Sequence, residues 1–207
     1  MTERPGGCGV MKATALTLES GPGGVVLYGS LRNVGESPAC GAAFSAELFD
    51  ASGQSVGAGV GGLLVRRFFR LADGSGTAAC VAPGDASMTS LRDLAPGVAP
   101  QDVSRVEYWC NYWSLDVVPL GSLEPRDVQT VPHGDGASFT GVLRNELGVP
   151  LPLPAVAVFP LDEQERPLGV ALAEGTEAVP AGGSWRFETG VVENAGVRVA
   201  AFPTRGP

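Results

Sequence analysis

Residues 29–57 read GSLRNVGESPACGAAFSAELFDASGQSVG, and a related stretch, GVLRNELGVPLPLPAVAVFPLDEQERPLG, follows at residues 141–169. The two stretches align without a gap at an offset of 112 positions. A sequence that repeats at a fixed offset indicates a duplicated structural unit, so the 207 residues are expected to form two related domains of common size. The identical residues are Gly29, Leu31, Arg32, Asn33, Pro38, Ala43, Asp50 and Gly57 in the first copy, and Gly141, Leu143, Arg144, Asn145, Pro150, Ala155, Asp162 and Gly169 in the second.

The pattern of apolar residues predicts strands and no long helix. Residues 25–32, 42–50 and 106–113 place apolar or small residues at every second position, a period that is typical of β-strands. Turn sequences rich in glycine and proline, such as GPGG at 21–24, separate the strands. With 44% apolar residues, the chain can build a core in spite of its 30 glycines and 17 prolines. The sequence therefore predicts an all-β fold of the sandwich type.

Domain boundaries follow from the repeat and from the segments around it. The start is rich in Gly and Pro, which predicts an irregular lead-in unless Cys8 ties it down. The first copy carries extra residues that the second lacks, including LLVRRFFRLADGSG at 63–76, and the stretch SLDVVPLGSLEP is short and apolar, as in a semi-rigid linker. The expected organisation is a lead-in at 1–12, a first sandwich domain at 13–113 with an insertion at 60–76, a linker at 114–125 and a second sandwich domain at 126–207.

The charge and the hydropathy pattern exclude several classes of partner. A net charge of −8 argues against nucleic acid and against an anionic membrane surface, since both require basic residues on the protein. No apolar run is long enough for a transmembrane segment. The start, MTERPGGCGV, lacks the apolar core of a signal peptide, so we expect either a cytoplasmic protein or a chain from which a leader or anchor has been removed. The cysteines favour the second interpretation.

All four cysteines lie in the first copy and its lead-in. An even number confined to one small domain predicts two disulfides and an oxidising compartment. Of the three connectivities, we prefer Cys40 with Cys80 and Cys8 with Cys110. Buried free thiols are the alternative, whereas a zinc site requires cysteine pairs much closer in sequence than these.

A short motif within the repeat resembles a known family. The first copy has Gly-x-Leu-x-Asn at 29–33, then AELFD at 46–50, then a Pro-Gly turn before the next strand. This pattern is similar to the FxLYD family of bacterial immunoglobulin-like domains, and Asn145 and Asp162 repeat its Asn and Asp in the second copy. The resemblance implies two tandem immunoglobulin-like β-sandwich domains in an envelope-associated or secreted bacterial protein. It brings no catalytic residues.

The second copy departs from that family pattern at two points. Pro160 lies inside an expected strand, which predicts that this strand is at a sheet edge, where a missing N–H is tolerated. The turn after Asp162 lacks the glycine that follows Asp50 in the first copy. We therefore expect the hairpin turn of the second copy to differ from that of the first.

The sequence offers little for catalysis. The one histidine, His133, lies in the turn PHGDG, and no G-x-S-x-G, P-loop, dinucleotide-binding or HExxH motif is present. The acidic residues lie mostly in turns, their ordinary place, although a carboxylate pair could in principle hydrolyse a glycoside. We expect no enzyme activity, no metal and no cofactor.

Two stretches are candidates for binding. Trp109, Asn111 and Trp113 share one face of a strand, an arrangement that suits sugar rings or a peptide, and the alternative is that the tryptophans pack against the second domain. The insertion mixes arginine with aromatic residues, which are enriched at protein interfaces, and the alternative is a hairpin that only covers a sheet edge. Its candidate residues are Arg66, Arg67, Phe68 and Arg70.

These features predict a non-catalytic binding or scaffolding module of the bacterial cell envelope that acts through protein–protein contacts. The alternative is a carbohydrate-binding module that uses the aromatic strand face. The expected partner is another envelope or extracellular protein, or a glycan in the alternative. The expected location is periplasmic, outer-membrane-associated or secreted.

Overall fold

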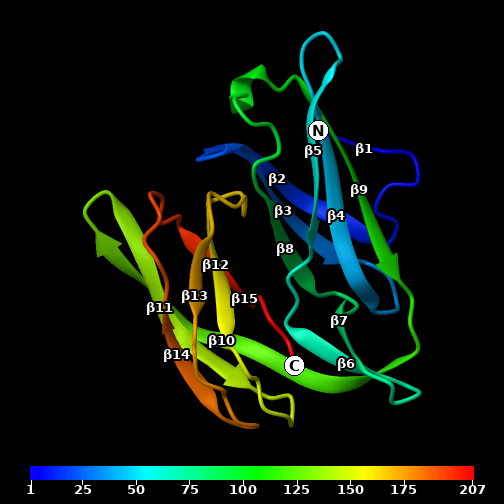
Figure 1. Cartoon of the computed structure of the whole chain (residues 1–207), viewed down its shortest axis with the longest axis vertical. Coiled ribbons are helices and arrows are strands. Elements are labelled where there is room, and N and C mark those ends of the chain that lie inside the picture. The colour runs from blue at the N-terminus through cyan, green and yellow to red at the C-terminus, as the bar shows by residue number, and fades with distance from the viewer. The chain divides into compact units, whose positions relative to one another are not determined.

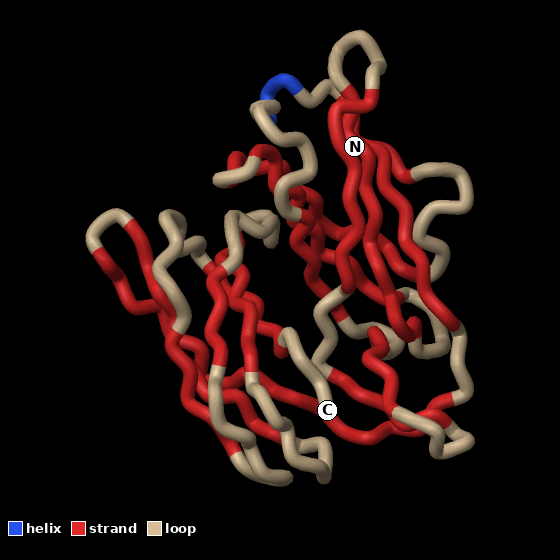
Figure 2. Tube along the Cα trace, in the orientation of Figure 1, coloured by secondary structure: helices blue, strands red, loops and turns tan.

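The computed structural model describes all 207 residues, and the chain is all-β. It divides into two compact units, the first formed by residues 1–63 and 81–114 and the second by residues 64–80 and 115–207. The only helix is a three-residue 3-10 turn, Pro100–Asp102, in the first unit (Figure 2). No helix has the length and apolar character needed to cross a bilayer.

The first unit contains two β-sheets (Figure 1). One has the order β2-β3-β8, with β2 at Met11–Gly21, β3 at Gly24–Asn33 and β8 at Ala86–Leu91. The other has the order β1-β9-β4-β5, with β1 at Thr2–Glu3, β9 at Arg105–Trp113, β4 at Ala39–Phe49 and β5 at Ser55–Gly62. Neighbouring strands are antiparallel except β1 and β9, which are parallel. Leu27 and Leu31 of β3 and Phe44 and Leu48 of β4 are fully buried, as predicted for the inward faces of these strands. The face of β3 that was expected to point outward is largely buried too, because Val26, Tyr28 and Ser30 are at most 9% exposed.

The second unit also contains two β-sheets (Figure 1). One has the order β7-β6-β10-β11-β14, with β7 at Thr77–Val81, β6 at Arg67–Leu71, β10 at Val117–His133, β11 at Gly136–Asn145 and β14 at Ser184–Glu188. The other has the order β13-β12-β15, with β13 at Ala171–Glu174, β12 at Ala155–Leu161 and β15 at Arg198–Pro203. Phe159 and Phe202 meet edge to face in the core, with ring centroids 6.4 Å apart.

The same order of strands occurs in both units. The sheet β2-β3-β8 corresponds to β10-β11-β14, and β9-β4-β5 corresponds to β15-β12-β13. Leu31 and Leu143 occupy the same position on the central strands β3 and β11, and neither is exposed to solvent. The repeated stretch therefore starts on the central strand of one sheet and continues on the central strand of the other in each unit.

The repeated asparagine closes the loop between these two sheets. The amide nitrogen of Asn33 donates to the carbonyl oxygens of Ser37 and Val81 at 2.9 and 2.8 Å, and its oxygen accepts the N–H of Gly35. Asn145 makes the same kinds of bond in the second unit, and both asparagines are fully buried. Backbone groups that leave a strand inside the protein require such partners, which explains why the residue occurs in both copies.

The repeated aspartate forms the same turn in both copies. The Oδ1 atom of Asp50 accepts the N–H groups of residues 52 and 54, and that of Asp162 accepts those of residues 164 and 166. Gly53 has a φ of 83°, and Glu165 takes its place in the second copy with a φ of 60°. The expectation of a different turn in the second copy is therefore wrong, because a glutamate adopts the left-handed conformation that usually favours glycine.

Pro160 does not mark an edge strand. Its strand, β12, is the central strand of β13-β12-β15. The pairing of β12 with β13 ends at Val158, and the carbonyl oxygen of Pro160 accepts the N–H of Leu168 on that side. In an antiparallel sheet the N–H and C=O of one residue point to the same side. The missing N–H of Pro160 therefore lies beyond the end of β13, on the side that faces Leu168, and does not interrupt the pairing of β12 with β15.

The segments expected to be an insertion and a linker are strands of the second unit. The expected insertion at 60–76 belongs to the first unit only up to Leu63, and β6 pairs with β10. The expected linker at 114–125 is largely the first half of β10. Pro119 and Gly121 resemble strand breakers in the sequence, but they lie at a register shift in the pairing with β6. Prolines and glycines are tolerated at such bulges, so these two residues do not interrupt the strand. The same residue types also occur in linkers, which is why the segment resembled one.

Two disulfides are present. Cys8 and Cys110 are joined, the pair preferred from the sequence, and their Cα atoms are 4.3 Å apart. Cys40 and Cys80 are also disulfide-bonded, and no cysteine is free. Two disulfides are typical of proteins that fold outside the cytosol, in an oxidising compartment.

Candidate functional site

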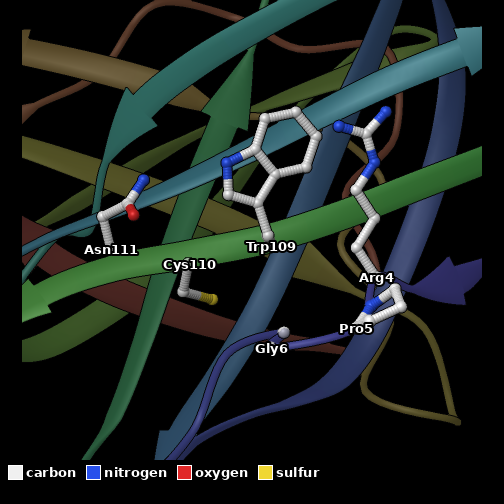
Figure 3. A pocket seen from close by; sticks show the side chains of 7 residues that line it. Arg4, Pro5, Gly6, Trp109, Cys110 and Asn111 are labelled. Atoms are coloured by element: carbon white, nitrogen blue, oxygen red, sulfur yellow. The ribbon is translucent and has the colours of Figure 1, made fainter.

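Strand β9 presents aromatic side chains on the outer face of its sheet. Val106 and Cys110 of β9 are buried, whereas Asn111 and Trp113 are exposed and Trp109 is half-buried. Neighbouring β9 residues point to opposite faces, so Trp109, Asn111 and Trp113 share the outer face, as predicted from the alternation. Figure 3 shows Trp109 and Asn111 on the same side of the strand, and Cys110 on the other. We call these three residues the aromatic face.

The N-terminal segment forms one end of this face. Residues 2–3 pair in parallel with β9, the N–H of Arg4 donates to the carbonyl oxygen of Tyr108, and that of Cys110 donates to Gly7. The bond between Cys8 and Cys110 fastens the segment to the strand. We call residues 1–9 the strap. The sequence predicted an irregular lead-in here, with Cys8 as the one signal that it could be tied down.

The side chain of Arg4 lies against Trp109. Its guanidinium carbon is 4.2 Å from the centroid of the indole ring, which is within the range of a cation–π interaction. Its Nε atom donates to Glu107 at 2.8 Å, and its NH2 group forms a second ion pair with Glu47 of the adjacent strand β4. In Figure 3 the guanidinium group stands beside the indole ring of Trp109, on the side away from Asn111. The contribution of Arg4 to this face could not be predicted from local patterns, because the pairing of β1 with β9 joins segments about a hundred residues apart.

The charges around Arg4 balance one another. The hydrogen bonds that Arg4 donates to Glu107 and Glu47 raise the pKa of its guanidinium group. A hydrogen bond from Ser55, followed by that from Arg4, lowers the pKa of the Glu47 carboxyl. The Glu47 carboxyl is therefore ionised at neutral pH, and the ion pairs with Glu47 and Glu107 offset the charge of Arg4 at this end of the face.

Trp113 is the most exposed aromatic residue of the face. Its side chain is 66% exposed, and its ring packs on the bare backbone of Gly41, where an added Cβ would lie 2.3 Å from the ring. Gly41 has a φ of 56°, so glycine is favoured there by both conformation and space. The indole of Trp113 is thus supported from below and remains open to a ligand.

Two hollows flank Asn111. The first has a volume of about 350 Å³ and is bounded by Arg4, the chain at 5–7 and Trp109. The second has a volume of about 380 Å³ and is bounded by Gly41 and Trp113. Asn111 lines both hollows. Each hollow therefore combines one indole ring with the same side-chain amide.

The arginine-rich segment serves the packing of the second unit. Arg66 donates through Nε and NH2 to the carbonyl oxygen of Ala201, at 3.1 and 2.9 Å, and lies 4.4 Å from the ring centroid of Phe202. Phe68 is only 5% exposed, while Arg67 and Arg70 are exposed. The structure thus does not gather the four predicted residues on one surface. If this segment were a separate insertion, the fold would tolerate a deletion of residues 63–75. In the structure such a deletion would remove β6 and the Arg66 contacts from the second unit.

The one histidine has a structural contact. His133 Nε2 lies 2.8 Å from the hydroxyl oxygen of Ser138, across the hairpin between β10 and β11. Ser138 is 1% exposed, so its hydroxyl is closed to a substrate. No group of three or more His, Cys, Asp or Glu side chains is placed to hold a metal ion.

No protein-family model matches the chain, and no curated protein matches it significantly.

Proposed function

We propose that this chain is a non-catalytic binding or scaffolding module of the bacterial cell envelope, built from two tandem immunoglobulin-like domains of the FxLYD type. Three observations support the proposal. The two units share one order of strands, the asparagine and aspartate of the motif make equivalent bonds in both, and the disulfides fit an oxidising compartment.

The aromatic face of the first unit is the proposed binding surface. The observation that carries this proposal is the exposure of Trp113, with Trp109 and Asn111 in line beside it on one strand. Tryptophan is strongly enriched at binding surfaces because it combines a large apolar area with a polar N–H. The arginine-rich segment carries less weight as a protein-binding element, since Arg66 and Phe68 are used within the second unit.

Co-sedimentation with the membrane-and-wall fraction of the producing cells tests the proposal. The wild-type chain should pellet with this fraction, and the double variant Trp109→Ala/Trp113→Ala should remain in the supernatant. The matched control is Trp185→Phe, which changes the third tryptophan, in β14 of the second unit. A wild-type protein that stays in the supernatant, or a double variant that still pellets, would contradict the proposal.

A further inference from the structure

We infer that the aromatic face binds a neutral glycan chain, with one sugar ring in each of the two hollows and Asn111 between them. This inference rests on the proposed function and names the ligand class of the same surface. It depends on three features of the face: the repetition of the two hollows, their charge and their depth.

The two hollows repeat one arrangement along the strand. Each has one indole ring, and both share the amide of Asn111. Trp109 and Trp113 are four residues apart in β9, so their Cα atoms are separated by roughly 13 Å along the strand. Two similar subsites in a row match a ligand that repeats its own chemistry, as a glycan chain does. An amide offers both donors and an acceptor, which suits the hydroxyl groups of two neighbouring sugar rings.

The charge of the hollows favours a neutral ligand. Arg4 is the only charged residue that lines either hollow. It already pairs with Glu47 and Glu107 and lies over Trp109. An anionic ligand would have to compete with two carboxylates for this guanidinium, and the chain as a whole carries a net charge of −8.

The depth of the face favours sugar rings over a protein anchor. Protein interfaces depend on a side chain that is buried in a deep pocket at their centre. In the second hollow the floor beside Trp113 consists of Gly41 and Ala43, and the indole ring lies above Gly41. Flat stacking on an indole with hydrogen bonds at the ring edge needs no deep pocket.

Fluorescence titration tests this inference directly. In the Trp185→Phe variant only the two tryptophans of the face remain, so any change in emission reports on this surface. The probes are cellotetraose, maltotetraose and N-acetylchitotetraose, each beside its disaccharide. We expect at least one tetrasaccharide to bind about tenfold more tightly than its disaccharide, because it reaches both indole rings.

Two variants and a control separate the outcomes. Trp113→Ala should weaken binding of that tetrasaccharide about tenfold with little effect on folding, since the ring is mostly exposed. Asn111→Ala should weaken it severalfold, and Val197→Ala, an equally exposed apolar residue of the second unit, should leave it unchanged. The inference is overturned if none of the six sugars binds at about 1 mM, or if Trp113→Ala binds as well as the parent.

Protease treatment of the envelope fraction distinguishes this inference from the proposed function. If pelleting depends on Trp109 and Trp113 but is lost after protease treatment of the fraction, the surface binds a protein, and the glycan inference fails while the binding module stands. If pelleting survives the treatment and one of the tetrasaccharides competes with it, the inference is supported. If nothing pellets, the proposed function itself fails.

Discussion

Replacing Asn145 by alanine should destabilise the second unit far more than the same replacement of any other asparagine or glutamine in that unit. The fully buried Asn145 bonds to four backbone groups, the carbonyl oxygens of residues 149, 179 and 180 and the N–H of Leu147. The N–H of Leu147 is buried and would lose its partner, whereas the carbonyl oxygen of Val179 would keep the backbone N–H of Leu151. A buried group left without a partner costs about 1 to 3 kcal/mol, and each further hydrogen bond that is lost costs about 0.5 to 1.5 kcal/mol. The expected loss is therefore about 2 to 5 kcal/mol in the free energy of unfolding.

Urea denaturation measures this loss with a tryptophan in the same unit. In a Trp109→Phe/Trp113→Phe background, Trp185 of β14 is the only tryptophan, so the tryptophan emission reports on the second unit. The control is Asn194→Ala, which removes a single bond from the N–H of Gly196 at an exposed site. It should cost about 0.5 kcal/mol, as exposed hydrogen bonds typically do.

The equivalent change in the first unit gives a second check. Of the bonds made by Asn33, only that to the carbonyl oxygen of Val81 is fully buried. Asn33→Ala should therefore cost less than Asn145→Ala, about 1 to 3 kcal/mol. If Asn145→Ala cost no more free energy of unfolding than Asn194→Ala, the side chain of the repeated asparagine would not hold these loops in place. The structural role assigned to this residue in both copies would then be refuted.

Three further perturbations test other parts of the molecule. Cys8→Ser/Cys110→Ser opens a covalent loop with a sequence separation of 102, and should cost about 2 to 5 kcal/mol in thermal or urea unfolding; an unchanged midpoint would contradict this. Glu165→Gly relieves a left-handed glutamate and should stabilise the chain by about 1 kcal/mol, whereas a loss of stability would show that its exposed ion pair with Arg198 matters more. The lowered pKa of Glu47 means that its contribution to stability is complete above its ordinary value of 4.5 and is lost as the pH falls through the lower folded-state value. The melting temperature of Glu47→Gln should consequently fall less than that of the wild type between about pH 6 and about pH 3, and equal falls would exclude the linkage.

Local patterns in the sequence were sufficient for the strands that carry the repeat. The alternation in β3, β4 and β9 predicted the residues that point into the core, because one face of each strand must meet it, but Val26, Tyr28, Ser30 and Ser45 on the opposite faces are buried as well. It also placed Trp109, Asn111 and Trp113 on the outer face. The aspartate turns could be predicted for the same reason, since the bonds of Asp50 reach only four residues along the chain.

Pairings between distant segments could not be predicted in this way. Residues 64–80 follow β5 in sequence but belong to the second unit, where β6 pairs with β10. The apolar residues of β6 have no period that separates a core face from an outer face, because Phe68 and Phe69 are both buried. Likewise, the parallel pairing of β1 with β9 involves only two residues of a Gly- and Pro-rich segment.

The proposed binding site depends on the redox state of its compartment through the disulfide between Cys8 and Cys110. The strap supplies Arg4 and the chain at 5–7 to the first hollow, and its pairing with β9 is short. Cys110 points away from the aromatic face (Figure 3). Its disulfide with Cys8 holds the strap. In a reducing compartment the strap would keep its ion pairs, which are partly exposed and worth little, the contact of Arg4 with Trp109 and a few backbone bonds. The first hollow would then lose its wall, whereas the second, formed by Gly41 and Trp113, would remain. The proposed binding surface is complete only where the disulfide is stable, and this favours a site of action outside the cytosol.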